Sequence, residues 1–234
     1  MKTTTQENIV AKEGMARRSF LKYAGAGAMA AGVLATAASC QKHGGVIGDP
    51  APPTSIDLGT GDVAVLNYAY ALEQLEAAFY TQVIATPFSG ITTEERALLT
   101  EIRDHEIIHR DFFKTALAGN AIPGLTPNFS TINFSSKDSV LKAAKAFEDL
   151  GVAAYNGAGY LIQNVDYLLL AGKIVSVEAR HAALIRNLLG ENLADASILD
   201  MTTSLEKSKS PAEVLKIANT FVSGLPLSAP SLGA

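Results

Sequence analysis

One pattern of glutamate, tyrosine and histidine occurs twice in this chain. In each copy a Glu precedes a Tyr by seven residues, and Glu-x-x-His begins about thirty residues after that Glu. The two copies are Glu73, Tyr80, Glu106 and His109, and then Glu148, Tyr155, Glu178 and His181. Offsets of three and seven residues return to the same face of an α-helix. Each copy can therefore direct its carboxylates and imidazole inward from two neighbouring helices, and together they predict a two-metal site.

Stretches with helical spacing of apolar residues predict four long helices and a shorter one. We expect them at residues 63–84, 93–118, 138–163, 166–189 and 211–222. Thr92 or Thr93 can cap the second helix, and Ser136 or Asp138 the third. The third helix contains Gly151, Gly157 and Gly159. Each glycine costs up to about 1 kcal/mol relative to Ala, so we expect close helix packing or a kink to require them.

Connection lengths predict how these helices are arranged. The first and second helices are joined by a short loop, as are the third and fourth, so each pair should be antiparallel. Between the pairs, the 17 residues from Gly119 to Ser135 could stretch over roughly 56 to 61 Å. A 25-residue helix is only about 37 Å long. The chain should therefore be an all-α four-helix bundle with one long crossover, plus a short C-terminal helix.

The same connections place the pattern's residues level with one another. Glu73 and Glu106 are nearly equidistant from the centre of the first loop, and Glu148 and Glu178 from the centre of the second turn. Four core carboxylates would neutralise two divalent ions, whereas without metal they would be buried like charges. One neutral imidazole for each ion adds a terminal ligand and leaves positions open for oxygen, peroxide or water.

At this point the chain resembles the ferritin-like di-metal carboxylate proteins over roughly residues 62–190. It is most similar to bacterial ferritin-like domain proteins related to plant desiccation-related proteins, in Leu72–Tyr80 and Ala146–Tyr155. The resemblance implies that Glu73 and Glu148 are single-carboxylate ligands. It also implies bridging ligands at Glu106 and Glu178, terminal ligands at His109 and His181, and hydrogen bonds to the ligands from Tyr80 and Tyr155.

Residues beside the pattern receive separate predictions. Glu76 is an alternative ligand to Glu73, but the repeat favours Glu73 because Gly151 stands at the position matching Glu76. Four polar neighbours of the ligands are expected on the solvated helix surface: Asp104, His105, Asp149 and Arg180. Three aromatic residues are expected to pack in the core: Phe79, Phe112 and Phe147.

The N-terminus resembles an export signal. Arg17 and Arg18 precede Ser-Phe-Leu-Lys and an apolar stretch, a pattern similar to a twin-arginine signal peptide over residues 1–39. Ala37 to Cys40 resembles a lipobox, in which Cys40 is lipidated and anchors the exported protein on the periplasmic side of a membrane. Cleavage after Ala37 would instead leave a soluble periplasmic protein. We expect a flexible tether at residues 40–61 and a C-terminal extension at residues 191–234.

Composition narrows the function classes. The net charge is −4 and 48% of the residues are hydrophobic, so the chain can bury a core but has no basic field for nucleic acid. We expect a monomer or homodimer that binds two Fe or two Mn ions. If it is an enzyme, it is a di-metal oxidoreductase of ferroxidase, peroxidase or catalase type. The alternative is a non-catalytic, stress- or desiccation-related protein that retains the metal site.

Overall fold

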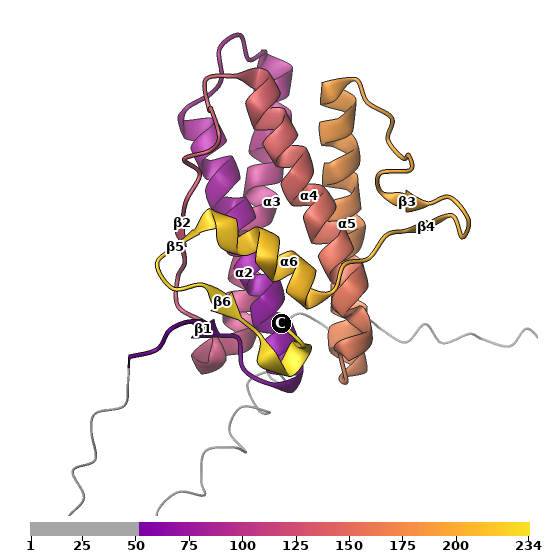
Figure 1. Ribbon diagram of the computed structural model, residues 1–234. Helices are drawn as coiled ribbons and strands as arrows, with labels where there is room; N and C mark the ends of the chain where they lie inside the picture. The colour runs from indigo at the N-terminus through magenta and orange to yellow at the C-terminus, as the bar shows by residue number, and fades with distance from the viewer. Residues whose placement is uncertain (1–51) are drawn as a thin grey trace, which may run out of the picture. The chain divides into compact units, whose positions relative to one another are not determined.

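The computed structural model describes residues 52–234, in which four long helices form a bundle (Figure 1). These helices are α2 (Gly61–Ala85), α3 (Thr93–Leu117), α4 (Lys137–Ala158) and α5 (Val165–Leu189). Helix α2 packs against α3 and α4 against α5, while α2 also contacts α4 and α3 contacts α5. The residues between α3 and α4 run along the bundle as one long crossover (Figure 1). The predicted all-α, ferritin-like bundle is confirmed.

Polar side chains fix the ends of the helices. Thr92 and Glu95 form a reciprocal capping box at the start of α3, and Gly190, with φ of 71°, ends α5. Helix α4 ends at Ala158 in a 3₁₀ turn rather than near residue 163, so the predicted end was wrong. The carboxylate of Asp62 accepts hydrogen bonds from the backbone N–H groups of residues 163 and 164, at 2.8 and 3.0 Å. These bonds hold the α4–α5 turn against the start of α2.

The crossover, residues 118–136, is fastened to α2. The Asn67 side chain donates to the carbonyl of Asn120 at 2.9 Å and accepts from the backbone of Ile122. Aromatic rings then fill the space between the crossover and the bundle. The ring centroids of Phe79 and Phe147 lie 5.0 Å apart, and that of Phe129 lies 6.0 Å from Phe147. This cluster covers one side of α2 and α4, and the predicted packing role of Phe79 and Phe147 is confirmed.

Short strands join segments that are distant in the sequence. The pairs are β1 (Ile56–Asp57) with β6 (Leu227–Ser228), β2 (Thr126–Pro127) with β5 (Val222–Ser223), and β3 (Leu199–Asp200) with β4 (Leu205–Glu206). Leu58, just after β1, is fully buried. The segment predicted as a tether up to residue 61 is therefore fixed to the domain from Ile56 onward. Hydrophobic contact and backbone pairing with the C-terminal extension account for this difference.

The C-terminal extension crosses α4 at a glycine. Helix α6 (Pro211–Ala218) buries Val214 and Leu215 against the bundle. Just before α6, the Lys209 backbone N–H donates to the Ala153 carbonyl at 2.9 Å. A Cβ at Gly157 would lie only 1.8 Å from the Lys209 carbonyl oxygen. Gly157 is therefore required by the close approach of this extension, rather than by helix–helix packing or a kink.

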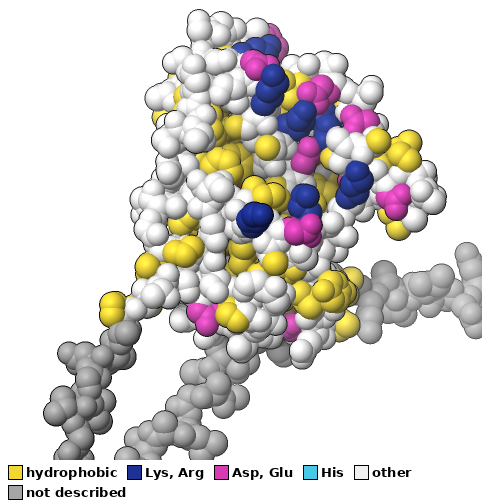
Figure 2. Space-filling model, in the orientation of Figure 1, with side chains coloured by type: hydrophobic (Ala, Val, Ile, Leu, Met, Phe, Trp, Pro, Cys, Tyr) yellow, Lys and Arg dark blue, Asp and Glu magenta, His cyan; other side chains and the backbone are white. Residues whose placement is uncertain are grey.

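The surface over α4 and α6 carries interspersed basic and acidic side chains (Figure 2). Some are paired, as in the contact of Lys145 Nζ with Glu191 at 2.6 Å. No helix within residues 52–234 combines the length and apolar character needed to cross a membrane.

Candidate metal centre

The six ligands predicted from the repeated pattern meet in the middle of the bundle. Helices α2 and α4 each contribute one glutamate, and α3 and α5 each contribute a glutamate and a histidine three residues later. All four carboxylates are fully buried, and the two histidines are 6% and 7% exposed. The residues are Glu73, Glu106, His109, Glu148, Glu178 and His181.

These side chains form two overlapping groups, each able to hold a metal ion. One comprises Glu73, Glu106, Glu178 and His109, and the other Glu106, Glu148, Glu178 and His181. Within each group, one donor atom from every residue lies within 4.8 Å of the others. Because Glu106 and Glu178 belong to both groups, the two positions are adjacent and have two carboxylates in common.

Each imidazole faces carboxylates from several helices. His109 Nδ1 lies 2.9 Å from Glu178, 3.4 Å from Glu73 and 3.6 Å from Glu106. His181 Nδ1 lies 2.7 Å from Glu106 and 3.6 Å from Glu148. The Glu-x-x-His spacing brings the histidine and glutamate of one helix to the same face, and two other helices supply the remaining carboxylates.

The donor atoms fit a pair of cations. Both imidazole Nδ1 atoms, both oxygens of Glu106 and Glu178, and the second oxygen of Glu73 and Glu148 are buried without a hydrogen-bond partner of suitable geometry. Buried polar groups normally have such partners, so this concentration of unsatisfied atoms requires another explanation. Carboxylate and imidazole donors suit iron or manganese. The described residues are thus compatible with a di-metal centre.

Two tyrosines bind the terminal carboxylates across the bundle. The Tyr80 hydroxyl of α2 donates to Glu148 Oε1 of α4, and the Tyr155 hydroxyl of α4 donates to Glu73 Oε1 of α2, both at 2.5 Å. Each tyrosine therefore contacts the glutamate of the opposite copy of the pattern. The bonds use one oxygen of each carboxylate and leave Oε2 directed towards the histidines.

Most titratable groups of the metal-free centre are shifted towards their protonated forms. Glu106 is the opposite case: burial raises its pKa, but hydrogen bonds from His109 and His181 outweigh this effect and lower it to about 2. Burial raises the pKa of Glu73 to about 7, with Glu106 adding to the shift and His109 opposing it. Burial and repulsion from Glu106 raise the pKa of Glu178 well above its ordinary value. Burial lowers the pKa of His109, but the facing carboxylates outweigh this effect and raise it to about 12. Cations that bind here would have to displace protons, so their affinity should rise with pH.

Glu76 lies beside the centre without belonging to either group. It is 3% exposed, and its carboxylate oxygen would be 3.1 Å from a Cβ placed on Gly151. That Cβ would also lie 3.9 Å from an oxygen of Glu178. Glu73 lies in one of the two groups of donors, whereas Glu76 lies among the same carboxylates without belonging to either group.

Two neighbours of the ligands are not simple surface residues, contrary to prediction. The His105 ring packs against both histidines, with centroids 4.5 Å from His109 and 5.2 Å from His181. Its spacing of four residues from His109 could have indicated this contact. Asp149 is half-buried and accepts a 2.5 Å bond from Arg186, which is 1% exposed. Asp104 and Arg180 are exposed as predicted.

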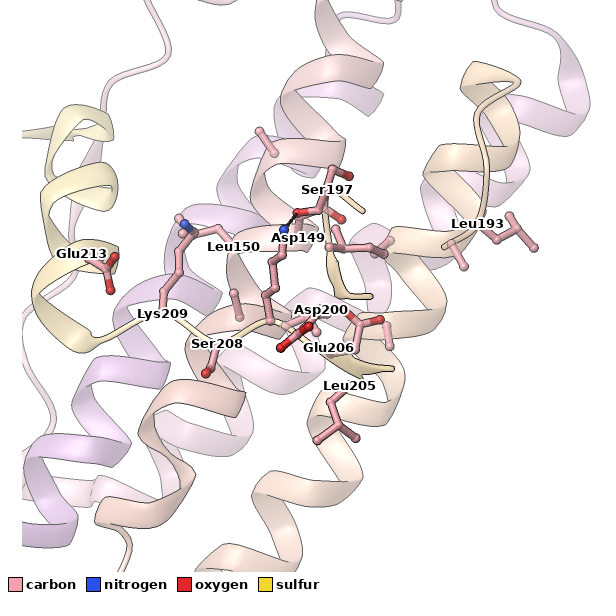
Figure 3. A pocket seen from close by; sticks show the side chains of 18 of the residues that line it. Asp149, Leu150, Leu193, Ser197, Asp200, Leu205, Glu206, Ser208, Lys209 and Glu213 are labelled. Atoms are coloured by element: carbon pink, nitrogen blue, oxygen red, sulfur yellow. Dashed lines mark hydrogen bonds between the residues drawn. The ribbon is translucent and has the colours of Figure 1, made fainter. Parts of the chain in front are cut away.

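A separate cleft of about 600 Å³ lies on the outside of α4 and α5. The segment after α5 forms its outer wall, with Leu193 on one side and Glu213 of α6 on the other (Figure 3). Asp149 and Leu150 line it on the bundle side, but none of the six predicted ligands does. The metal-ligand candidates and this cleft are thus distinct features.

The predicted export and lipidation residues, Arg17, Arg18 and Cys40, lie outside the described residues.

Comparison with known proteins agrees with the geometry. A family model described as a ferritin-like domain matches residues 61–191, which include all four bundle helices and all six candidate ligands. No curated protein matches the chain in sequence.

Proposed function

The chain belongs to the ferritin-like domain family, and on this basis we propose that it holds two iron or two manganese ions for redox chemistry. The substrates would be oxygen, peroxide or ferrous iron. The observation that carries the proposal is the pair of buried ligand groups with Glu106 and Glu178 in common. Two adjacent positions of this kind are what an ion pair requires.

The ligand roles follow from where each side chain lies. Glu106 and Glu178 would bridge the two ions, because each belongs to both groups. Glu73 and His109 would complete one ion's ligands, and Glu148 and His181 the other's. Once bound, such an ion pair supplies electrons to oxygen or peroxide, or accepts them from ferrous iron.

The protein's contribution is to position these ligands and exclude water. Hydrogen bonds from Tyr80 and Tyr155 orient the two terminal carboxylates. Full burial of the four glutamates keeps water away from them and strengthens every charge interaction in the centre. Protons held on the carboxyl groups before metal binding would leave as the cations enter.

Export and membrane anchoring form a second part of the proposal. The resemblance of residues 16–22 to a twin-arginine signal fits a domain that folds and takes up metal before export, and Cys40 would carry the lipid. Mass spectrometry of the mature N-terminus tests this. A lipidated Cys40 would support the anchor, whereas an unmodified thiol would exclude it.

The redox proposal is tested by metal analysis and gas consumption on protein made in its native host. We expect close to two equivalents of iron plus manganese, and iron-dependent consumption of oxygen or peroxide. Glu106→Gln should abolish consumption, while Glu101→Gln, on the exposed face of the same helix, should leave it unchanged. Less than about one equivalent of metal in the native protein would refute the di-metal site. Two bound ions without any consumption would favour the non-catalytic alternative.

A further inference from the structure

Glu76 is a buried carboxyl group without a protein partner. It lies one helical turn after Glu73 on α2 and is 3% exposed. Within residues 52–234, none of the groups that influence this carboxyl group most strongly is a hydrogen-bond donor or a basic side chain. Its strongest influences are burial and the negative charges of other glutamates, among them Glu178 and Glu106, and all of them raise its pKa. Glu73 and Glu148, in contrast, each have a tyrosine donor and a facing histidine.

The space for this carboxyl group comes from a glycine on the facing helix. Within the first helix of each copy the residues are related by a constant offset, so Glu73 matches Glu148, Tyr80 matches Tyr155, and Glu76 matches Gly151. A Cβ at Gly151 would lie 3.1 Å from Glu76 Oε1, which is closer than side chains usually approach. The two matched positions thus meet each other, and the absent side chain of one makes room for the carboxylate of the other.

A role in packing alone does not account for this choice of residue. Burying an unpaired carboxyl group among four others costs free energy, whether it is ionised or must take up a proton. A methionine would fill a similar volume without that cost. A carboxylate at this position gains only if cations are close by. An oxygen of Glu178, which belongs to both candidate ion positions, approaches the same Gly151 position as Glu76.

We propose that Glu76 is a fifth carboxylate ligand of the metal pair, reaching it from the α2–α4 side through the space left at Gly151. This inference rests on the proposed di-metal function. Five carboxylates carry one more negative charge than two divalent ions neutralise, so the set favours a pair in which one ion is trivalent. Because α4 has no counterpart of Glu76, the two metal positions are also inequivalent.

Calorimetric titration of the metal-free mature protein with Mn²⁺ tests the proposal. Glu76→Gln should weaken binding of at least one ion about tenfold or more, which is the scale seen for the loss of even an outer ligand partner. Glu101→Gln is the matched control and should bind as the native protein does. Unchanged affinities in Glu76→Gln, together with two bound ions in the native protein, would overturn this inference alone. Fewer than two ions in the native protein would overturn the proposed function as well.

A double-mutant cycle separates ligation from a general effect on packing. Gly151→Ala should weaken Mn²⁺ binding in the native background, because its methyl group displaces the Glu76 carboxylate. In a Glu76→Ala background the methyl group meets only an oxygen of Glu178, at an ordinary van der Waals distance of 3.9 Å, and should have no further effect. Equal weakening in both backgrounds would show that Gly151 acts independently of Glu76 and would contradict the proposal. Circular dichroism of each metal-free variant confirms that it is folded.

Discussion

Gly157→Ala should detach the C-terminal extension from the bundle. The new methyl carbon would lie 1.8 Å from the Lys209 carbonyl oxygen and 2.7 Å from its carbon. Both atoms belong to the backbone, so no side-chain rotation relieves the clash. Movement of Lys209 breaks its hydrogen bond to Ala153, at a cost of about 0.5 to 1.5 kcal/mol. It also pulls on α6, which begins two residues later.

The size of the effect depends on the buried side chains of α6. Val214 and Leu215 are almost fully buried, and exposing each costs about 1.5 to 3 kcal/mol. The higher helix propensity of Ala relative to Gly stabilises the variant by up to about 1 kcal/mol and partly offsets this loss. We therefore expect the free energy of unfolding to fall by about 2.5 to 6.5 kcal/mol. For a domain of this size each kcal/mol corresponds to roughly 2 to 4 °C in the unfolding midpoint.

Thermal unfolding followed by circular dichroism measures this change, and limited proteolysis shows whether residues 191–234 become accessible. Gly172→Ala is the matched control, because a Cβ at Gly172 on α5 meets no atom within 4 Å. The control should unfold at the native temperature or slightly above it. If Gly157→Ala unfolds at the same temperature as Gly172→Ala, the close approach of Lys209 to α4 does not exist as described.

Three further predictions concern the centre and its surroundings. Because burial raises the pKa of Glu178 above the ordinary 4.5, the metal-free folded state binds more protons than the unfolded chain. Burial also raises the pKa of Glu73 to about 7, so the free energy of unfolding should fall as the pH rises from about 5 through 7. Urea denaturation on both sides of pH 7 would contradict the reasoning if stability increased with pH. Tyr80→Phe and Tyr155→Phe should each weaken metal binding roughly 10- to 100-fold, measured by competition with a chelator, and an unchanged affinity in both would refute their orienting role. Asp149→Asn leaves the buried Arg186 without its closest carboxylate and should cost about 3 to 5 kcal/mol in urea denaturation; a loss below about 1 kcal/mol would mean that Glu191, 3.6 Å away, replaces it.

The candidate ligands could be predicted from the sequence because helix geometry is local. Once Glu106 and His109 share a helix, their spacing alone puts them on one face. The lengths of two short loops then determine which helices are neighbours, and the ligands lie far enough from the helix ends that errors of a few residues there do not matter. The same reasoning did not predict where α4 ends, because Asp62, about a hundred residues earlier, holds that turn.

Contacts between distant segments left no local signal. Gly157 meets Lys209 through a backbone contact, and a glycine's sequence neighbours do not reveal what passes over it. The pairing of β1 with β6 involves only two residues on each side, too few for a recognisable alternation of polar and apolar residues. His105 differs from these cases. Its four-residue spacing from His109 indicates that the two rings share one helix face, but how far His105 is exposed also depends on how closely α5 packs against α3.

The crossed tyrosine–glutamate bonds make the two halves of the chain interdependent. The tyrosine of each helical hairpin donates to a glutamate of the other hairpin. A hairpin on its own would therefore lack both the acceptor for its tyrosine and the donor for its glutamate. Two identical hairpins related by a twofold axis would satisfy each other completely, so the two halves of this single chain are arranged like the two subunits of a symmetric homodimer. A substitution of Tyr80 therefore removes a hydrogen bond from Glu148 in the other half. A change in one half of the centre thus also affects the other half. Gly151 opposite Glu76 is a position where the halves differ, and there the single chain has an option that a symmetric pair of hairpins would lack.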